Sequence, residues 1–363
     1  MRILFVSDLL SYGGASKLIY DLLPRMVRLG HFCELLILTD KNSKYIDELT
    51  ESGVSVHVVP NNVQSKTGRI RYIKRFITQN NYDVVHANLF PVIYYCSIAK
   101  RLSGKSFPKL VMTEHSTDNK RRHKAFLRPL ERFIYKNYDH IISISDKTQE
   151  NLCGWLKLKD NSKFSVIHNG IDIDRFKSAE CLNREAVITN PASDDILLLT
   201  VGSFTRQKNH LKLLEAIALL PDNFKLILCG EGPLKDEIIE KINSLDIVNR
   251  VDLLGFRKDI DRIMHTADIL VIPSIWEGFG LIAAEGMACG IPMAVSDVPG
   301  LSEVVGDAGI KFDPDSAESI KTAIIEASDK TKSYELSAKG QNRVLLYDIN
   351  NVVREYIEVY ERC

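Results

Sequence analysis

The sequence predicts two α/β domains in tandem, each built on a parallel sheet with helices on both faces. The chain has 363 residues, which is long for one core and suits two. Short apolar runs alternate with helical stretches, and this alternation starts afresh after a polar segment at 178–194. The charge is also split, since residues 1–177 carry 28 Lys and Arg against 17 Asp and Glu, whereas 178–363 carry 19 against 30. A basic half and an acidic half indicate two domains with different partners.

The first half contains runs rich in β-branched and apolar residues that predict six strands, at 2–8, 33–39, 55–60, 83–88, 109–115 and 140–145. Amphipathic segments separate them, and the one at 13–30 ends at Gly30, as helices often do. Strands that are continuously apolar and separated by helices favour a parallel sheet that is covered on both sides.

The second half repeats this pattern, with strands expected at 196–204, 224–233, 251–256, 268–274, 291–297 and 308–313. Residues 350–363 have apolar side chains at helical spacing, so the chain is expected to end on a helix. We therefore predict an N-terminal domain at 1–177, a linker at 178–194, a C-terminal domain at 195–345 and a terminal helix at 346–363.

Composition excludes several classes of protein. No apolar run approaches the roughly 20 residues of a membrane span, and residues 1–10 read as a first buried strand rather than a signal peptide. The seven cysteines are scattered without a CxxC pair, which favours reduced thiols in a cytoplasmic protein over disulfides or a zinc site.

Three junctions between a strand and a helix have the character of anion-binding loops, because helix N-termini present free N–H groups at the carboxyl ends of parallel strands. The first is "SDLLSYGGASK", in which Gly13 and Gly14 would let the backbone approach an anion. It is not the dinucleotide pattern GxGxxG, and a plain tight turn is the alternative interpretation.

The second junction is "VGSFTRQKN", where Arg206 and Lys208 follow a strand and precede a long helix. Two cations beside a helix N-terminus suit a diphosphate, particularly one that leaves during a reaction. The alternative is a pair of solvated surface cations.

The third junction joins the strand "DILVIPS" through the loop "IWEGFG" to the helix "LIAAEGMAC". Glu285 lies inside this helix, where a carboxylate needs a polar partner and can accept from both hydroxyls of a ribose. Glu277 lies in the loop and would be further along the same ligand, near a sugar.

The stretch "EGFGLIAAE" resembles the Glu-x7-Glu signature of the retaining, nucleotide-sugar-dependent glycosyltransferases with the GT-B fold (glycosyltransferase family 4, "glycosyl transferases group 1"). The resemblance covers nearly the whole chain. "SYGGASK", "VIHNGIDIDRF", "VGSFTRQKN", "LCGEGP", "LLGF" and "ACGIPMAVSDVPG" follow in the order and spacing of that family. It implies two Rossmann-like domains that face each other across a cleft, with the C-terminal helix crossing back to the N-domain.

The resemblance also implies roles for individual residues. Glu285 would bind the nucleotide ribose, and Glu277 the transferred sugar. Further donor contacts are implied for the main-chain N–H groups of Phe279, Gly280 and Leu281, for Gly202, and for Arg257 in the base pocket. Arg206 and Lys208 would hold the diphosphate, Gly13 and Gly14 would close over it, and His115 in "VMTEHS" would lie beside the sugar.

The sequence departs from the family at one position, since many members have Arg directly after the glycine of "VG", where this chain has Ser203. Lys208 is consequently the firmer assignment. The patterns at Asp172–Asp174 and Asp313–Asp315 satisfy a short DxD metal motif, but neither is interpreted as a ligand set. No cofactor and no metal are expected, with a nucleotide-diphosphate sugar as co-substrate.

A basic amphipathic segment at 120–136 predicts contact with an anionic membrane surface. Phe126, Leu130, Phe133 and Ile134 share one helical face, and Arg121, Arg122, Lys124, Arg128, Arg132 and Lys136 supply the charge. The alternative is a core-packed helix with a solvated face. The protein is expected to be cytoplasmic, at the inner face of the plasma membrane.

The sequence therefore predicts an enzyme that transfers a sugar, with retention of anomeric configuration, to a glycan or lipid-linked acceptor in bacterial surface polysaccharide synthesis. No nucleic-acid partner is expected. Other GT-B enzymes, such as a sugar-nucleotide epimerase or a phosphorylase, and a non-catalytic nucleotide-sugar-binding subunit stay open as alternatives. A dinucleotide oxidoreductase is disfavoured because GxGxxG is missing.

Overall fold

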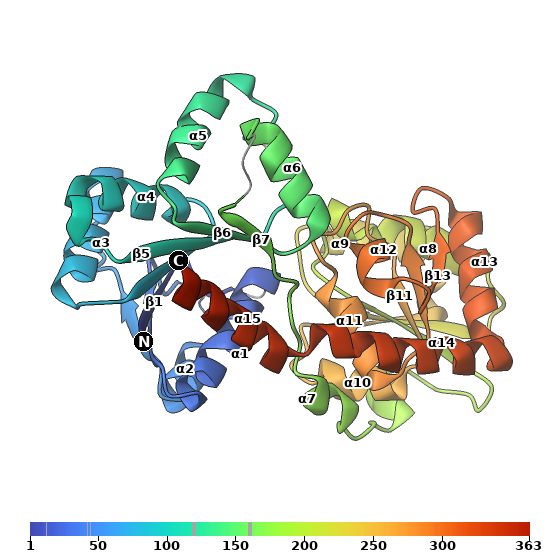
Figure 1. Ribbon diagram of the computed structural model, residues 1–363. Coiled ribbons are helices and arrows are strands. Elements are labelled where there is room, and N and C mark those ends of the chain that lie inside the picture. Colours follow the sequence, from blue (N-terminus) through green and yellow to red (C-terminus); the bar gives the residue numbers. More distant parts are fainter. Residues whose placement is uncertain (12, 42, 44, 118–120, 159–161) are drawn as a thin grey trace. The chain divides into compact units, whose positions relative to one another are not determined.

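The chain folds into two compact units, each a parallel sheet with helices on both faces (Figure 1). Unit 1 comprises Met1–Gly170 and Ile349–Cys363, and unit 2 comprises Ile171–Asp348. The structure is a computed structural model that describes all residues except 12, 42, 44, 118–120 and 159–161. The predicted α/β architecture with two Rossmann-like domains is confirmed.

Unit 1 contains a seven-stranded parallel sheet in the order β3-β2-β1-β4-β5-β6-β7. Its strands are β1 (Arg2–Ser7), β2 (Phe32–Ile37), β3 (Ser55–Val58), β4 (Val84–Asn88), β5 (Lys109–Glu114), β6 (His140–Ser143) and β7 (Phe164–Val166). Side chains alternate between the two faces of a strand, so Leu4 and Val6 enter one core while Ile3 and Phe5 enter the other. Both faces are apolar because both are covered by helices.

Helices on the first face of this sheet are α3 (Lys66–Gln79), α4 (Val92–Ser103), α5 (Arg128–Lys136) and α6 (Asp146–Leu156). Those on the second face are α1 (Gly14–Arg28), α2 (Ile46–Glu51) and α15 (Ile349–Arg362). Although α15 ends the chain, Tyr356 and Tyr360 are buried in the core of unit 1. The Tyr356 hydroxyl lies 3.1 Å from Thr113 Oγ1, and the Tyr360 hydroxyl lies 2.7 Å from His86 Nδ1. The last helix therefore belongs to unit 1, as the fold prediction requires.

Unit 2 contains a six-stranded parallel sheet in the order β10-β9-β8-β11-β12-β13. Its strands are β8 (Ile196–Val201), β9 (Phe224–Cys229), β10 (Val251–Gly255), β11 (Ile269–Ile272), β12 (Met293–Ser296) and β13 (Ile310–Phe312). Its helices are α7 (Ile173–Lys177), α8 (His210–Ala218), α9 (Lys235–Ser244), α10 (Ile260–Thr266), α11 (Leu281–Cys289), α12 (Leu301–Val305), α13 (Ala317–Ser328) and α14 (Lys330–Arg343).

The segment 178–194, treated above as a linker, is part of unit 2. The Arg184 guanidinium donates to the Asp268 carboxylate at 3.1 and 3.2 Å, and the Thr189 hydroxyl donates to Asp252 at 2.7 Å. These hydrogen bonds hold the stretch to unit 2 together with the buried Val187 and Ile188, which are 1% and 4% exposed. The two units divide instead between Gly170 and Ile171, ahead of the boundary predicted at residue 177.

The predicted basic helix at 120–136 requires a correction. Helix α5 begins only at Arg128, with Pro129 in its first turn, and residue 120 lies outside the described residues. Arg121 and Arg122 pair with the buried carboxylates of Glu131 and Glu114, at 2.9 Å each. Neither arginine therefore belongs to the solvated basic face on which the membrane prediction placed it.

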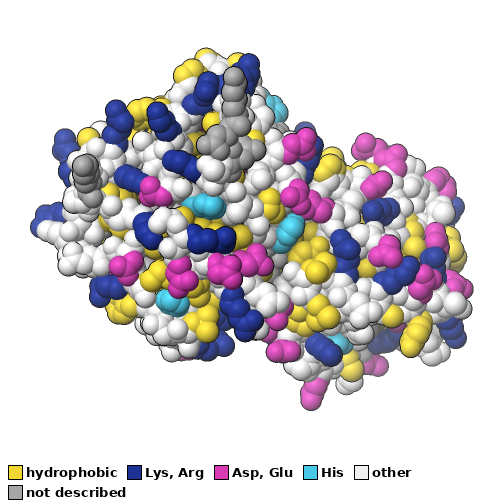
Figure 2. Space-filling model, viewed as in Figure 1, with side chains coloured by type: hydrophobic (Ala, Val, Ile, Leu, Met, Phe, Trp, Pro, Cys, Tyr) yellow, Lys and Arg dark blue, Asp and Glu magenta, His cyan; other side chains and the backbone are white. Residues whose placement is uncertain are grey.

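The apolar side of this segment is divided as well. Ile134 is fully buried in the core of unit 1, whereas Phe126, Leu130 and Phe133 are 75%, 46% and 41% exposed. Hydrophobic side chains lie beside Lys and Arg at the end of unit 1 that carries α5 (Figure 2). Among the described residues, no helix has the length and apolar character that crossing a membrane requires.

Both sheets reverse their strand order at a defined point, between β1 and β4 in unit 1 and between β8 and β11 in unit 2. Ligands of open parallel sheets bind outside the carboxyl ends of the strands at such a switch point. The segments that follow β1, β8 and β11 contain the predicted residues Gly13 and Gly14, Arg206–Lys208 and Glu277, and β4 ends at Asn88. The topology thus brings predicted site residues of each unit to the place where a ligand is expected.

Candidate active site

The candidate active site of unit 2 joins the segments that follow β8 and β11. Residues Arg206–Lys208 form a short 3-10 helix before α8. The N–H of Ile275 donates to the Gln207 carbonyl at 2.8 Å, and the Gln207 amide donates to the Trp276 carbonyl at 2.9 Å. The predicted diphosphate loop and the loop that carries Glu277 are therefore fastened together through the residue between the two cations.

Lys208 and Glu277 form an ion pair, with Lys208 Nζ 2.6 Å from Glu277 Oε1. The Ser274 hydroxyl donates to the same oxygen at 2.8 Å and is fully buried. The side chains of Lys208 and Glu277 are only 20% and 8% exposed, so this is a largely desolvated charge pair. The sequence analysis assigned Lys208 to the diphosphate and Glu277 to the sugar of one ligand. In the structure the two side chains form an ion pair with each other.

Gly202 allows Lys208 to reach this position. A Cβ atom at residue 202 would lie 3.2 Å from Lys208 Cδ and Cε, so the lysine stem lies against the glycine backbone. Gly230, in the segment after β9, packs against the same place, since a Cβ there would be 1.9 Å from the Gly202 carbonyl oxygen. Both glycines are thus used for close backbone packing beneath the lysine.

Helix α11 begins at Leu281, directly after Gly280 in a left-handed conformation with φ of +84°. The first N–H groups of a helix have no partner within it, and its dipole favours an anion at this end. The Phe279 ring is buried and lies edge-on to Tyr347, with centroids 5.2 Å apart. Phe279 is therefore a packing residue through its side chain, and the predicted contact with the nucleotide sugar would involve its main chain.

Glu285 lies in the middle of α11 and is half-buried, between small residues that pack against the sheet. The pKa of the nearby Cys289 thiol is raised, first by burial and then by the negative charge of Glu285. The helix thus keeps a carboxylate in an otherwise apolar segment, and the ribose contact of Glu285 stays a prediction.

The other predicted donor residues of unit 2 differ in their surroundings. Arg206 is exposed, and its guanidinium has no hydrogen bond or ion pair with any described residue. Arg257 instead forms a bidentate pair with Asp259, at 2.8 and 2.6 Å. The hydrogen bond from Arg257 lowers the pKa of the Asp259 carboxyl. Arg206 is free to meet an anion, whereas Arg257 would have to share its charge with Asp259.

The predicted residues of unit 1 lie at the carboxyl end of its sheet. Gly13 is in extended backbone before α1, and Gly14 is the first residue of that helix. His115 directly follows β5, and its Nε2 lies 3.0 Å from Asn88 Oδ1. Burial lowers the pKa of His115 to about 4, so the ring is neutral at physiological pH.

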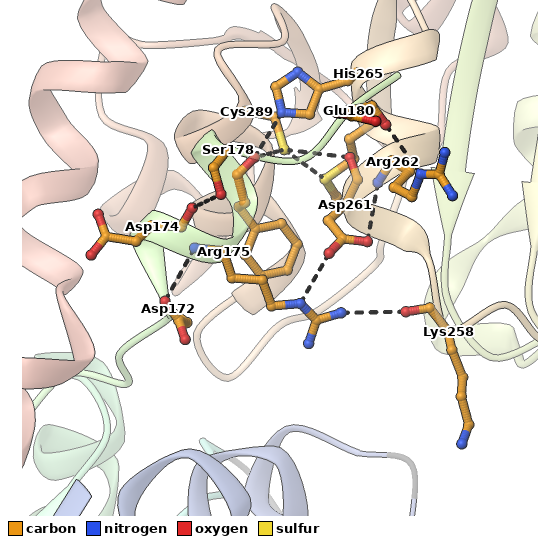
Figure 3. Close-up of polar contacts among 12 residues, drawn as sticks. Asp172, Asp174, Arg175, Ser178, Glu180, Lys258, Asp261, Arg262, His265 and Cys289 are labelled. Carbon is orange, nitrogen blue, oxygen red and sulfur yellow. Dashed lines mark hydrogen bonds and ion pairs between the residues drawn. The ribbon is translucent and has the colours of Figure 1, made fainter. Parts of the chain in front are cut away.

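The two DxD patterns are engaged in local backbone structure. Asp172 caps α7 by accepting the N–H of Arg175 at 3.2 Å, and Asp313 accepts the N–H of Asp315 at 3.0 Å. The Arg175 side chain then donates to Asp261 at 3.0 Å and to the Lys258 carbonyl at 3.3 Å, which holds α7 against α10 (Figure 3). Asp172 and Asp313 therefore each accept a hydrogen bond from the local backbone.

Sequence reasoning missed three residues that shape the site: Ser274, Gln207 and Gly300. Ser274 is a small polar residue between β11 and the loop that carries Glu277. That position was the only sequence signal for its hydrogen bond to Glu277. Gly300 has φ of +82°, and a Cβ there would lie 2.6 Å from the Glu277 carbonyl oxygen. No sequence pattern predicts the packing of Gly300 against the Glu277 carbonyl or the hydrogen bond from the Ile275 N–H to the Gln207 carbonyl.

Replacing Gly300 with Ala is expected to destabilise the protein by roughly 1–3 kcal/mol. Alanine would be strained at a positive φ, and its Cβ would clash with the Glu277 carbonyl oxygen. Gly154→Ala is the matched control, since that glycine lies within α6 and a Cβ there has no neighbour within 4 Å. Urea denaturation of both variants measures the difference. Equal stability of Gly300→Ala and wild type would contradict the tight packing under the Glu277 loop.

Comparison with known proteins assigns this chain and its fold to a class. Residues 12–175 match the model of Glycosyltransferase Family 4, and residues 183–343 match that of Glycosyl transferases group 1. The two matches follow each other along most of the chain, one on each unit. The chain belongs to this family of GT-B glycosyltransferases.

Two relatives act on lipid-linked substrates, as their names state. The chain is 26% identical over 369 residues to an N-acetylgalactosamine-N,N'-diacetylbacillosaminyl-diphospho-undecaprenol 4-alpha-N-acetylgalactosaminyltransferase of Campylobacter jejuni, with 96% of each chain covered. It is 26% identical over 287 residues to a UDP-Gal:alpha-D-GlcNAc-diphosphoundecaprenol alpha-1,3-galactosyltransferase of Escherichia coli, covering 75% of this chain and 73% of that one.

Solved structures share the fold over the full length. HepE of Anabaena, in complex with UDP and glucose, superposes with a TM-score of 0.87 at 21% identity, covering 100% of both chains. WaaG, a glycosyltransferase involved in lipopolysaccharide biosynthesis, superposes with a TM-score of 0.76 at 17% identity and 99% coverage of both. At these identities the likeness establishes the GT-B fold.

Proposed function

We propose that this glycosyltransferase moves a sugar from a nucleotide-diphosphate-sugar donor to a hydroxyl of a lipid-linked glycan acceptor, with retention of anomeric configuration, in bacterial surface polysaccharide synthesis. The main observation behind this proposal is the ion pair between Lys208 and Glu277, which joins the loops that follow β8 and β11. The relatives that use diphospho-undecaprenol-linked substrates support the class of acceptor.

In this proposal the donor diphosphate competes with Glu277 for Lys208. A diphosphate near the exposed Arg206 and the N-terminus of α11 would attract the Lys208 ammonium, which lies on the same loop as Arg206. Glu277 is then released to accept hydrogen bonds from the hydroxyls of the transferred sugar. Glu285 would accept from the ribose hydroxyls, which a carboxylate can bind in pairs.

The transfer step is proposed to take place on one face of the sugar. The acceptor hydroxyl oxygen forms a bond to the anomeric carbon while the bond from that carbon to the β-phosphate oxygen breaks. The hydroxyl proton passes to the departing phosphate oxygen. Lys208 and Arg206 would stabilise the charge on the leaving diphosphate, and Glu277 would stabilise the oxocarbenium-like sugar.

Neither a cofactor nor a metal takes part in the proposed step, because Arg206 and Lys208 offer two cations beside the diphosphate site. Transfer is accordingly expected to proceed at an unchanged rate in excess EDTA. A rate that falls with EDTA and returns with added Mg²⁺ or Mn²⁺ would contradict this part of the proposal.

A thermal-shift screen tests the donor site. Among UDP, GDP, ADP and their sugar conjugates, one base is expected to stabilise the wild type by about 2.7 kcal/mol at 100 times its Kd. Glu285→Ala should abolish this shift by removing the ribose acceptor. Glu318→Ala is the control, because Glu318 is a largely exposed carboxylate on α13 of the same unit. Stabilisation by NAD alone would contradict the proposed donor site.

We further propose that unit 1 contacts an anionic membrane through the exposed Phe126, Leu130 and Phe133. Lys124, Arg132 and Lys136 are exposed on the same segment and supply the charge. Each such cation near an anionic surface contributes about 1 kcal/mol, and inserted apolar side chains add to it.

The double variant Phe126→Ser/Leu130→Ser is expected to lower binding to phosphatidylglycerol-containing vesicles at least about tenfold, since burial of one large apolar side chain contributes roughly 1.5–3 kcal/mol. Leu345→Ser/Leu346→Ser, a pair of exposed leucines in unit 2, is the matched control. Vesicle co-sedimentation measures both. Equal binding of the two double variants would count against this surface.

A further inference from the structure

Both hydrogen bonds that the Glu277 carboxylate accepts end on one of its two oxygens. Lys208 Nζ lies 2.6 Å and Ser274 Oγ lies 2.8 Å from Oε1. No described residue donates to Oε2, and this atom is not among the buried side-chain atoms without a partner, so it keeps access to solvent. Although Glu277 is only 8% exposed, its free oxygen is therefore the one that a ligand can reach.

The two donors to Oε1 differ in how freely they can move. Lys208 has a long side chain that is 20% exposed, and its stem lies along the backbone of Gly202. Its ammonium can therefore turn toward a diphosphate bound at the same loop. Ser274 is fully buried three residues before Glu277, and its hydroxyl oxygen is placed by a single side-chain torsion. The serine is consequently the donor that stays in place when the lysine leaves.

The main chain of Glu277 is fixed, but its terminal torsion is not. A Cβ at residue 300 would lie 2.6 Å from the Glu277 carbonyl oxygen, and the Ile275 N–H donates to the Gln207 carbonyl at 2.8 Å. The last torsion of a glutamate is broad, so a carboxylate without a partner can turn either oxygen toward a ligand. Once Lys208 has left, Ser274 is the described residue whose hydrogen bond determines which way the carboxylate faces.

Ser296 shows the contrast with a purely structural serine. It is the last residue of β12, which lies beside β11 in the same sheet, and it is fully buried like Ser274. Its hydroxyl donates to the main-chain carbonyl of Ile272 at 3.2 Å. The hydroxyl of Ser296 thus joins two strands, whereas that of Ser274 donates to the carboxylate of a candidate site residue.

We propose that Ser274 is a positioning residue that holds Oε1 of Glu277, so that Oε2 faces the hydroxyls of the transferred sugar. When Lys208 turns to the leaving diphosphate, Ser274 keeps the carboxylate in its orientation. Every residue involved belongs to unit 2. The inference rests on the proposed glycosyl transfer, and it adds the serine and the oxygen atom through which Glu277 acts on the sugar.

Calorimetry tests this role without requiring turnover. The Kd values of UDP, GDP and ADP are compared with those of UDP-glucose, GDP-mannose and ADP-glucose, and the variants are measured with the pair that binds the wild type. Ser274→Ala removes one oxygen atom, and Ser274→Cys keeps the size of the side chain but donates more weakly. Ser296→Ala is the matched control, because it removes an equally buried hydroxyl from the next strand.

Ser274→Ala is expected to raise the Kd of the nucleotide sugar about 3- to 10-fold and to leave that of the nucleoside diphosphate unchanged, since only the sugar contacts Glu277. The kcat for sugar transfer should fall further, about 10- to 100-fold, because the orientation of Glu277 matters most in the transition state. Ser274→Cys should show the same pattern to a smaller extent, and Ser296→Ala should change none of these values.

A double-mutant cycle separates positioning from a structural role. Glu277→Ala has no carboxylate to hold, so adding Ser274→Ala to it should not weaken nucleotide-sugar binding further. A further loss as large as in the wild type would overturn the proposal. An unchanged nucleotide-sugar Kd in both Ser274 variants, or an equal loss of nucleoside-diphosphate affinity, would overturn it as well. A wild type that binds none of these nucleotides would instead overturn the proposed function, and the role of Ser274 with it, so the two failures are distinguishable.

Discussion

Lys208→Ala is expected to lower kcat for sugar transfer about 100- to 1000-fold, the loss typical of removing one group that stabilises developing charge in a transition state. The ammonium would no longer compensate the charge on the leaving diphosphate. Glu277, only 8% exposed, would keep its hydrogen bond from Ser274 but lose its ion pair. Both effects act at the step in which the glycosidic bond to phosphate breaks, so kcat should fall more than the donor affinity.

The control for this variant is Lys212→Ala. Lys212 is two-thirds buried on α8 of the same unit and pairs at 2.7 Å with Glu215, which also pairs with Lys241 of α9. It should transfer sugar at nearly the wild-type rate. Steady-state kinetics of both variants measure the rates, and thermal unfolding verifies that both are folded. If Lys208→Ala kept a kcat within about threefold of the wild-type value, the assignment of Lys208 to the leaving diphosphate would be contradicted.

Glu131→Ala is expected to destabilise the protein by about 3–5 kcal/mol, because it removes the shared partner of several buried or half-buried donors. The fully buried Glu131 carboxylate accepts from Tyr94 at 2.6 Å, from Arg121 at 2.9 Å and from Trp155 at 2.7 Å. With alanine at position 131, the Tyr94, Arg121 and Trp155 donors lose their common acceptor. Because they are largely shielded from water, they cannot replace this hydrogen bond fully with solvent.

Glu150→Ala provides the comparison, since Glu150 is a 70% exposed carboxylate on α6 that pairs with Lys147. Exposed pairs of this kind contribute about 1 kcal/mol or less. Urea denaturation should separate the two variants clearly. Similar unfolding free energies would mean that the Glu131 cluster does not stabilise unit 1.

The fold was predictable because its signals are local. Continuous apolar runs such as 2–8 and 268–274 predicted buried parallel strands, and the restart of the pattern in the second half predicted a second sheet. The wrong interpretation of 178–194 has a physical cause. That stretch shows no strand or helix periodicity, yet it is held to unit 2 by the buried Val187 and Ile188 and by side-chain hydrogen bonds such as Arg184 with Asp268.

The site was predictable only in part. Motif spacing placed Lys208 and Glu277 on the segments after two adjacent strands, but it did not predict that they pair with each other. The arginines at 121 and 122 were read as surface charge, because no sequence pattern shows that Glu131 and Glu114 are buried within reach of them. Long-range pairing of side chains depends on the packing of elements, and that information is not local.

The anomeric configuration of the product tests the central claim most directly. Wild-type enzyme, the nucleotide sugar selected by the thermal-shift screen and a diphospho-undecaprenol-linked acceptor would be combined, and the new glycosidic linkage examined by proton NMR. We predict that an α-linked donor gives an α-linked product, and that Lys208→Ala forms little of it. A β-linked product, or donor consumption without any sugar on the acceptor, would contradict the account.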